Sequence, residues 1–280
     1  MTSLLQLHDL VEGVVVKRPS RYIKTPYVAD VHLCLEDRDC LGHSASLGCC
    51  GLADVGASVL MGKAAPGKNK LRCEYKLFLS ILREKDQEIL VGIHPTLAEQ
   101  LVESALTKQC LSSLLKIQHY RTQATLFVEG SVNSRFDFAG IDAHGVPFLL
   151  EVKNVPLADY EDVPAKERKH MTFDNRALTS KVAYFPDGYR KQTKDPVSPR
   201  ALKHLRELTL IKRQSITRCI MCYVVQRPDV NRFRPSIIDP QYRAAFLEAQ
   251  AAGVEMIVMV VEWSREGVAR FVRDDLPIEF

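Results

Sequence analysis

The spacing of apolar residues changes near residue 86, and this change limits the folds open to the chain. Before it, short apolar runs such as LVEGVVVKR and YVADVHLCL are separated by turn-forming clusters such as GKAAPGKNK. Short strands with no long stretch of 3.6-residue period predict a small all-β barrel or sandwich over residues 1–86. After the change, strand-like and helix-like segments alternate, which predicts an α/β domain over residues 87–280.

Three helices are expected in the second part. A helix near 94–106 has Thr96 and Glu99 at capping-box spacing, and another is expected over 198–211. The third, over 239–253, has Asp239 as its N-cap and Gly253 at its C-terminal cap. His144 and Gly145 predict a hairpin turn between two strands. Buried strands are expected at 219–226 and 254–263.

Length and composition exclude several classes of protein. The 280 residues are 46% hydrophobic and 26% charged, which is ordinary for a globular protein. The longest apolar run, 254–261, is too short to span a membrane and contains Glu255. The amino terminus has no basic segment typical of a signal peptide, so we expect a cytoplasmic protein without membrane contact.

The net charge of +4 hides an uneven distribution. Residues 166–218 contain fourteen Lys or Arg and five Asp or Glu, so this segment carries +9 and the rest of the chain −5. A basic segment in an otherwise acidic chain indicates a polyanionic partner, although a solvated lysine-rich surface explains it equally well.

Eight cysteines raise the question of a metal site. The one Cys-x-x-Cys pair, Cys219 and Cys222, lies in an expected strand, where residues three apart point to opposite faces. Because no second pair completes a zinc site, free thiols are expected.

Charged residues within two apolar strands give the strongest indication of chemistry. Asp137 lies in SRFDFAG, and Glu151 and Lys153 lie in PFLLEVKN, two apart and therefore on one strand face. If the two strands pair, Asp137 comes close to Glu151. Two carboxylates suit Mg²⁺ or Mn²⁺, and a lysine beside them could position a water molecule and stabilise charge on a phosphate. A structural ion pair is the alternative.

The Asp-x13-Glu-Val-Lys arrangement resembles the PD-(D/E)XK nuclease superfamily. Several stretches spread along the chain resemble one family within it, the sugar fermentation stimulation protein (SfsA) family. These stretches are RYIKTPYVADV, LAEQLVESAL, LLEVKNVPL, FPDG, RALKHLREL and the 223–255 segment. The resemblance implies an OB-like barrel followed by a restriction-endonuclease-like α/β domain, with a central mixed sheet flanked by helices. It also implies nucleic-acid binding, metal-dependent nuclease activity and a regulatory role in bacterial sugar metabolism.

The resemblance assigns roles to particular residues. Asp137, Glu151 and Lys153 would be catalytic, and Asp137 and Glu151 would bind Mg²⁺ or Mn²⁺. Glu103 would add a third metal-binding carboxylate, with a solvated helix position as the alternative. The other expected contacts are with DNA or RNA, and they are Gln226, Arg227, Arg200, Lys203, Arg206, Arg21 and Lys24. For Arg227, an ion pair with Asp229 is the equal alternative.

Some positions depart from the family pattern. The family's His-x-Pro-Asn-Thr-Gly stretch corresponds here to residues 43–48, where only His43 and Gly48 remain, and His94-Pro95 replaces an Asn-Thr pair. The segment 159–183 is longer than expected, and either a lid over nucleic acid or a solvated loop would explain it.

The leading hypothesis is therefore a metal-dependent nuclease acting on DNA or RNA. The alternatives are a non-catalytic DNA-binding regulator that retains the nuclease fold and a regulator that binds a small molecule. The sequence leaves a homodimer open.

Overall fold

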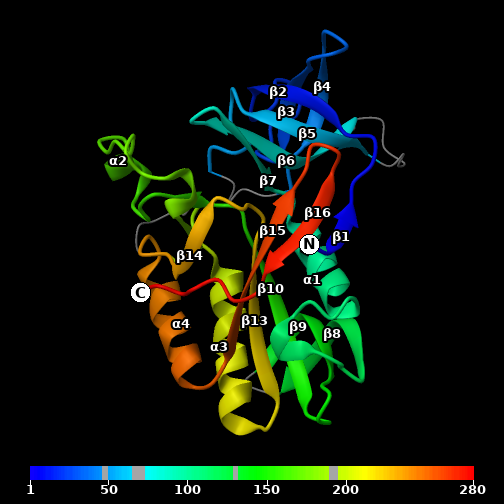
Figure 1. Cartoon of the computed structure of the whole chain (residues 1–280), viewed down its shortest axis with the longest axis vertical. Helices are drawn as coiled ribbons and strands as arrows, with labels where there is room; N and C mark the ends of the chain where they lie inside the picture. The colour runs from blue at the N-terminus through cyan, green and yellow to red at the C-terminus, as the bar shows by residue number, and fades with distance from the viewer. Residues whose placement is uncertain (46–49, 65–72, 129–131, 189–194) are drawn as a thin grey trace.

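Six strands of the first part of the chain form a sheet that closes on itself (Figure 1). The computed structural model describes residues 1–45, 50–64, 73–128, 132–188 and 195–280. The strand order is β4-β3-β2-β5-β6-β7, and an additional β4–β6 pairing completes the barrel. The strands are β2 (Val11–Lys17), β3 (Val28–Leu33), β4 (Arg38–His43), β5 (Ser58–Lys63), β6 (Tyr75–Glu84) and β7 (Gln87–Gly92). The predicted N-terminal barrel is confirmed.

The second part is built on a seven-stranded mixed sheet, with order β1-β16-β15-β13-β10-β9-β8. The central strands β10, β13 and β15 are parallel, and the outer pairs are antiparallel. The strands are β1 (Ser3–Gln6), β8 (His119–Val128), β9 (Val132–Ile141), β10 (Pro147–Val155), β13 (Arg218–Val225), β15 (Glu255–Trp263) and β16 (Val268–Arg273). This arrangement confirms the expected α/β domain with a mixed sheet.

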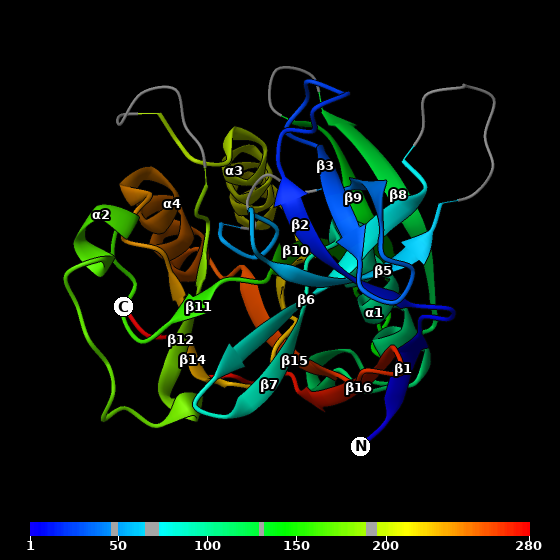
Figure 2. The ribbon, with the colours of Figure 1, turned by 90° about the horizontal axis from the view of Figure 1, so that it is seen from above.

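Helices cover the two faces of this sheet. Helix α1 (Pro95–Thr107) packs on one face together with apolar residues of the barrel, whereas α3 (Pro199–Gln214) and α4 (Pro240–Ala251) pack on the other. Figure 2 shows α3 beside α4, with α1 across the strands from them. On β13, Cys222 packs in the core beneath α1, and Cys219 packs in the core beneath α3 and α4. The two thiols therefore lie on opposite faces of the sheet, as predicted.

A smaller sheet connects the long segment 159–183 to the rest of the molecule. It contains β11 (Ala158–Asp159), β12 (Lys181–Phe185) and β14 (Val230–Pro235), and the segment also forms α2 (Ala165–Arg168) and a short 3₁₀ turn, Leu178–Ser180. A second 3₁₀ turn, Ser112–Leu114, follows α1. The Tyr160 hydroxyl donates to Glu84 of the barrel at 2.6 Å, and Lys85 Nζ donates to the carbonyl of Asp174 at 3.0 Å. The segment therefore packs against the barrel.

The domain boundary differs from the expected one in two ways. Residue 86 lies in the turn between β6 and β7, and the barrel continues to Gly92. In addition, β1 pairs with β16 and so belongs to the large sheet. A local pattern cannot reveal this pairing, since the partner strand lies more than 260 residues away.

The helix ends follow the sequence in one case and differ in another. Asp239 caps α4 by accepting a hydrogen bond from Tyr242 N at 3.0 Å, as predicted. The capping box at α1 was wrong: α1 has no side-chain cap, and Thr96 Oγ1 instead lies 2.8 Å from His94 Nδ1. Within the described residues, no helix is long and apolar enough to cross a membrane.

Candidate active site

The candidate site lies where strands β9 and β10 separate. Their pairing ends at Leu150 opposite Phe138, and the next residues are Glu151 and Asp137. Asp137 Oδ2 enters the gap and accepts a hydrogen bond from the backbone N–H of Val152 at 2.7 Å. Asp137 is 8% exposed and Glu151 is 2% exposed. The hairpin therefore brings the two carboxylates together as the sequence predicted.

The two oxygens of the Glu151 carboxylate have different surroundings. Glu151 Oε1 contacts Lys153 Nζ and the ring nitrogen Nδ1 of His204. Glu151 Oε2 is buried and has no hydrogen-bond partner among the residues that the structure describes. An unpaired buried carboxylate oxygen is costly, so this atom indicates a position for a cation or a donor.

His204 was not predicted as a site residue. It lies on α3, is 4% exposed, and its ring packs against Phe136 at 6.0 Å between centroids. The sequence did contain a signal, because position 204 shares the inward helix face with Ala201 and Leu208. A histidine on that face must find a polar partner inside the protein, and Glu151 is that partner.

Helix α1 contributes Glu99 to the same cavity as Asp137 and Glu151. Gln123 Nε2 donates to Glu99 Oε2 at 2.8 Å. Glu103, the expected third metal ligand, is exposed one turn further along and lines a neighbouring hollow that Glu99 and Asp137 share. Of the two glutamates, Glu99 therefore has the position that the sequence interpretation gave to Glu103.

The crowded carboxylates perturb one another's pKa values. Burial, together with the charge of Glu151, raises the pKa of Asp137 to about 7. Burial and Glu151 also raise the pKa of Glu99. Burial alone would raise the pKa of Glu151, but Lys153 and His204 outweigh it and hold the pKa below its ordinary value. Such clustering of opposed shifts is typical of functional sites.

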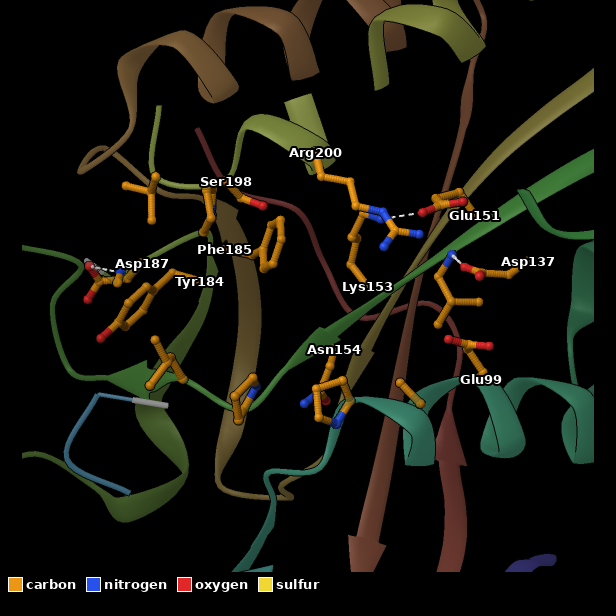
Figure 3. Close-up of a pocket in the computed structure, with 18 residues that line it drawn as sticks. Glu99, Asp137, Glu151, Lys153, Asn154, Tyr184, Phe185, Asp187, Ser198 and Arg200 are labelled. Carbon is orange, nitrogen blue, oxygen red and sulfur yellow. Dashed lines mark hydrogen bonds and ion pairs between the residues drawn. The ribbon is translucent and has the colours of Figure 1, made fainter. Parts of the chain in front are cut away.

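These carboxylates lie at one end of a cavity of about 450 Å³. Figure 3 shows Glu99, Asp137 and Glu151 at that end, with Asp187 and Tyr184 towards the other. The remaining labelled side chains are Lys153, Asn154, Phe185, Ser198 and Arg200, all of which line the cavity. The cavity therefore runs from the end of β10 to the end of β12 and the start of α3.

The donor set fits a hard divalent cation. Asp137 and Glu151 supply carboxylate oxygens, which Mg²⁺ and Mn²⁺ prefer, and no described residue forms a hydrogen bond with Glu151 Oε2. Among the described residues, no three His, Cys, Asp or Glu side chains already form a complete ligand set. Mg²⁺ usually retains several water ligands, so two carboxylates with water suffice in principle.

Two of the expected nucleic-acid contacts are buried inside the protein. Arg227 is 2% exposed and forms two hydrogen bonds of 2.7 Å with Asp229, so the alternative ion pair is the correct interpretation. Gln226 is fully buried between Trp263 and Asn154. The prediction that these two side chains contact phosphate was wrong, because the strand end on which they lie is covered by the barrel and the small sheet.

The other expected contacts lie on the surface. Arg200 lines the cavity, and Lys203 and Arg206 are exposed on α3. On the barrel, Lys24 is exposed and Arg21 is half exposed, where it pairs with Asp30 at 2.9 Å. Their contact with nucleic acid stays a prediction.

Much of the charge in the basic segment is neutralised by neighbours. The ion pairs of this segment are Arg168–Asp159, Arg176–Glu161, Lys181–Asp229, Lys203–Glu207, Arg213–Glu248 and Arg218–Glu255. Three further basic residues of the segment, Arg190, Lys191 and Lys194, lie outside the described residues. So do residues 46–48, part of the 43–48 stretch that differs from the family pattern. The segment therefore presents less free positive charge than its composition suggests.

The fold and this cluster define a two-domain protein, with a β-barrel joined to a mixed-sheet domain that carries an Asp…Glu-x-Lys site. The family model described as "Sugar fermentation stimulation protein RE domain" matches residues 96–267. The chain belongs to the sugar fermentation stimulation protein (SfsA) family.

Similar proteins agree with this assignment. A sugar fermentation stimulation protein homolog of Maricaulis maris is 29% identical over 262 residues, which cover 93% of each chain. A homolog of Jannaschia sp. is 31% identical over 230 residues, 82% of this chain and 80% of the relative. The solved structure "The structure of Pyrococcus Furiosus SfsA in complex with Ca2+" is 20% identical, has a TM-score of 0.72 and covers both chains completely. This last likeness shows the shared fold.

Proposed function

We propose that the protein is a metal-dependent phosphodiesterase that hydrolyses DNA or RNA at the Asp137–Glu151–Lys153 cluster. The observation that carries this proposal is the buried Glu151 Oε2, which has no hydrogen-bond partner in the described part of the chain and lies beside a second carboxylate whose pKa is raised. A divalent cation would favour the ionised form of Asp137, whose pKa is raised, and would offset the repulsion between Asp137 and Glu151.

Each residue of the cluster has a separate proposed role. Asp137 and Glu151 would hold Mg²⁺ or Mn²⁺, which when bound supplies Lewis-acid stabilisation of a phosphate oxygen and activation of water. Lys153 Nζ lies against Glu151 and opens to the cavity, so it can donate a hydrogen bond to a water molecule or a phosphate oxygen. The buried His204 contacts the same oxygen, Glu151 Oε1, and so helps to hold the carboxylate in place.

A relative supports the choice of a divalent cation. The structure from Pyrococcus furiosus is described as a complex with Ca²⁺, an ion that prefers the same oxygen ligands as Mg²⁺. The donor atoms available here, carboxylates rather than thiols or paired imidazoles, agree with that preference.

The test is a cleavage assay with and without Mg²⁺ or Mn²⁺ on single- and double-stranded DNA and RNA. Lys153→Met should reduce metal-dependent cleavage by at least about 100-fold, the range for loss of a group that stabilises transition-state charge. Lys116→Met, the same substitution at an exposed lysine in the loop before β8, is the matched control and should cleave like the wild type. Equal cleavage by both variants, or none by the wild type, would overturn the proposal.

The alternative is a nucleic-acid-binding regulator without catalysis. It is favoured by one observation: Lys153 and His204 already contact Glu151, as in a purely structural ion-pair network. The two functions differ in metal binding. Calorimetry with Mn²⁺ should show a site in the wild type that Glu151→Gln loses if the cluster is catalytic, and no site in either protein if it is structural.

A further inference from the structure

A chain of three hydrogen-bonding side chains crosses the interior behind the candidate site. Trp263 Nε1 donates to Gln226 Oε1 at 3.0 Å, and Gln226 Nε2 donates to Asn154 Oδ1 at 2.7 Å. Trp263 and Gln226 are buried, whereas Asn154 is half-buried and lines the cavity. The chain thus leads from the core to the site.

The donor and acceptor roles in these two hydrogen bonds follow from the chemistry of the side chains. The tryptophan indole has only a donor, so the oxygen of Gln226 must face it. The nitrogen of Gln226 therefore faces Asn154, which must present its own oxygen in return. The Asn154 side-chain nitrogen remains on the other end of the amide and has no partner in the described part of the structure. Asn154 is therefore oriented as a donor to the cavity.

The position of Gln226 is closely constrained. A β-carbon added to Gly92 of the barrel would lie 1.9 Å from Gln226 Oε1, and the Gly92 N–H donates to the Gln226 carbonyl at 3.1 Å. Gly92 and Trp263 both lie next to the Gln226 amide oxygen, and the hydrogen bond from the Trp263 indole keeps that oxygen facing them. The donor at Asn154 is thereby fixed before any ligand arrives, which is the preorganisation expected at a binding site.

The guanidinium group of Arg200 is a second hydrogen-bond donor that lines the same cavity. Arg200 lines it from the start of α3 and has no ion-pair partner in the portion of the chain that is described. In Figure 3, Arg200 and Asn154 lie on either side of Lys153. Three donors therefore surround the space next to the carboxylates, and guanidinium and amide groups are well suited to phosphate oxygens.

We propose that Asn154 and Arg200 bind the non-bridging phosphate oxygens of a nucleotide in this cavity, with Asn154 held as a donor by Gln226 and Trp263. This inference rests on the proposed function and specifies its substrate-binding residues. Asn154 would touch substrate, whereas Gln226 and Trp263 are positioning residues.

The test follows the Asn154 side-chain amide by NMR, identified as the pair of signals that Asn154→Asp removes. Thymidine 5′-monophosphate, with Ca²⁺ or with EDTA, should shift these signals saturably, inorganic phosphate should shift them in the same direction, and thymidine should not. If the nucleotide does not move them under either condition, the inference is wrong. A failed cleavage assay would reject the nuclease but not alter this readout.

Two substitutions separate ligand binding from a structural role. Asn154→Asp keeps an acceptor for Gln226 but removes the donor, and Asn154→Ala removes both. Nucleotide affinity should fall at least about fivefold in both, as for one hydrogen bond. If Asn154→Asp binds the nucleotide as the wild type does, the amide is only structural.

A third substitution tests the positioning role. Trp263→Phe frees the Gln226 amide to turn, so it should also lower the affinity for the nucleotide, by up to about fivefold. An unchanged affinity would exclude the positioning role.

Discussion

Replacing Asp137 by asparagine should stabilise the metal-free protein, and the gain should grow with pH. Burial and Glu151 raise the pKa of this carboxyl from 3.8 to about 7 in the folded protein. Between these two pKa values the unfolded chain has lost the proton and the folded chain retains it. Wild-type stability therefore falls as the pH rises through this range and levels off above about pH 7.

The magnitude follows from the two pKa values. Each pH unit between them is worth about 1.4 kcal/mol, so the full cost is about 4 kcal/mol at pH 8 and about 1.5 kcal/mol at pH 5. The Asp137→Asn protein avoids this cost, because a neutral amide oxygen can still accept the hydrogen bond from Val152 N. Below the ordinary carboxyl pKa of 3.8, the two proteins should be equally stable.

Urea denaturation at pH 4, 5 and 8 in the presence of EDTA measures the difference. Asp86→Asn, at an exposed turn residue with a positive φ of 60°, is the matched control and should show no comparable trend. Added Mn²⁺ should stabilise the wild type more than Asp137→Asn, since the carboxylate is a proposed ligand. A stability difference that stays constant from pH 5 to pH 8, or shrinks, would refute the reasoning.

Three further predictions concern the surroundings of the site. Gly92→Ala should destabilise the protein by about 1–3 kcal/mol in urea denaturation, because its methyl group would collide with Gln226. Arg227→Ala breaks a buried ion pair, so it should cost about 3–5 kcal/mol of stability, and a protein of wild-type stability would contradict the assignment. If nucleic acid binds along α3, Arg206→Ala should reduce the slope of log affinity against log salt by about 0.9, whereas Arg213→Ala, already paired with a glutamate, should change it less.

The sequence predicted the features that depend on local patterns. Asp137, Glu151 and Lys153 were recognisable because charged residues stood in apolar strands joined by a short hairpin, and pairing then determined their proximity. Cys219 and Cys222 were placed on opposite faces by strand periodicity alone. These inferences needed only residues close together in the chain.

Features that depend on packing between distant segments were missed. Glu99 and Glu103 differ by one helical turn, and the angle at which α1 crosses the sheet decides which of them enters the cavity. Arg227 looked available at a strand end, but the barrel and the small sheet bury it against Asp229. His204 required knowledge of which strand lies under α3.

The pairing of β1 with β16 has a consequence for how the chain is made. Ser3–Gln6 is synthesised before the barrel strands, and its partner Val268–Arg273 is synthesised after them and after α4. The barrel residues lie between them and can close earlier, because their contacts are nearer in sequence. The β1–β16 edge of the large sheet can therefore form only after Val268–Arg273 has been made, and a ribosome stalled before residue 268 would carry a folded barrel beside an unfinished site domain.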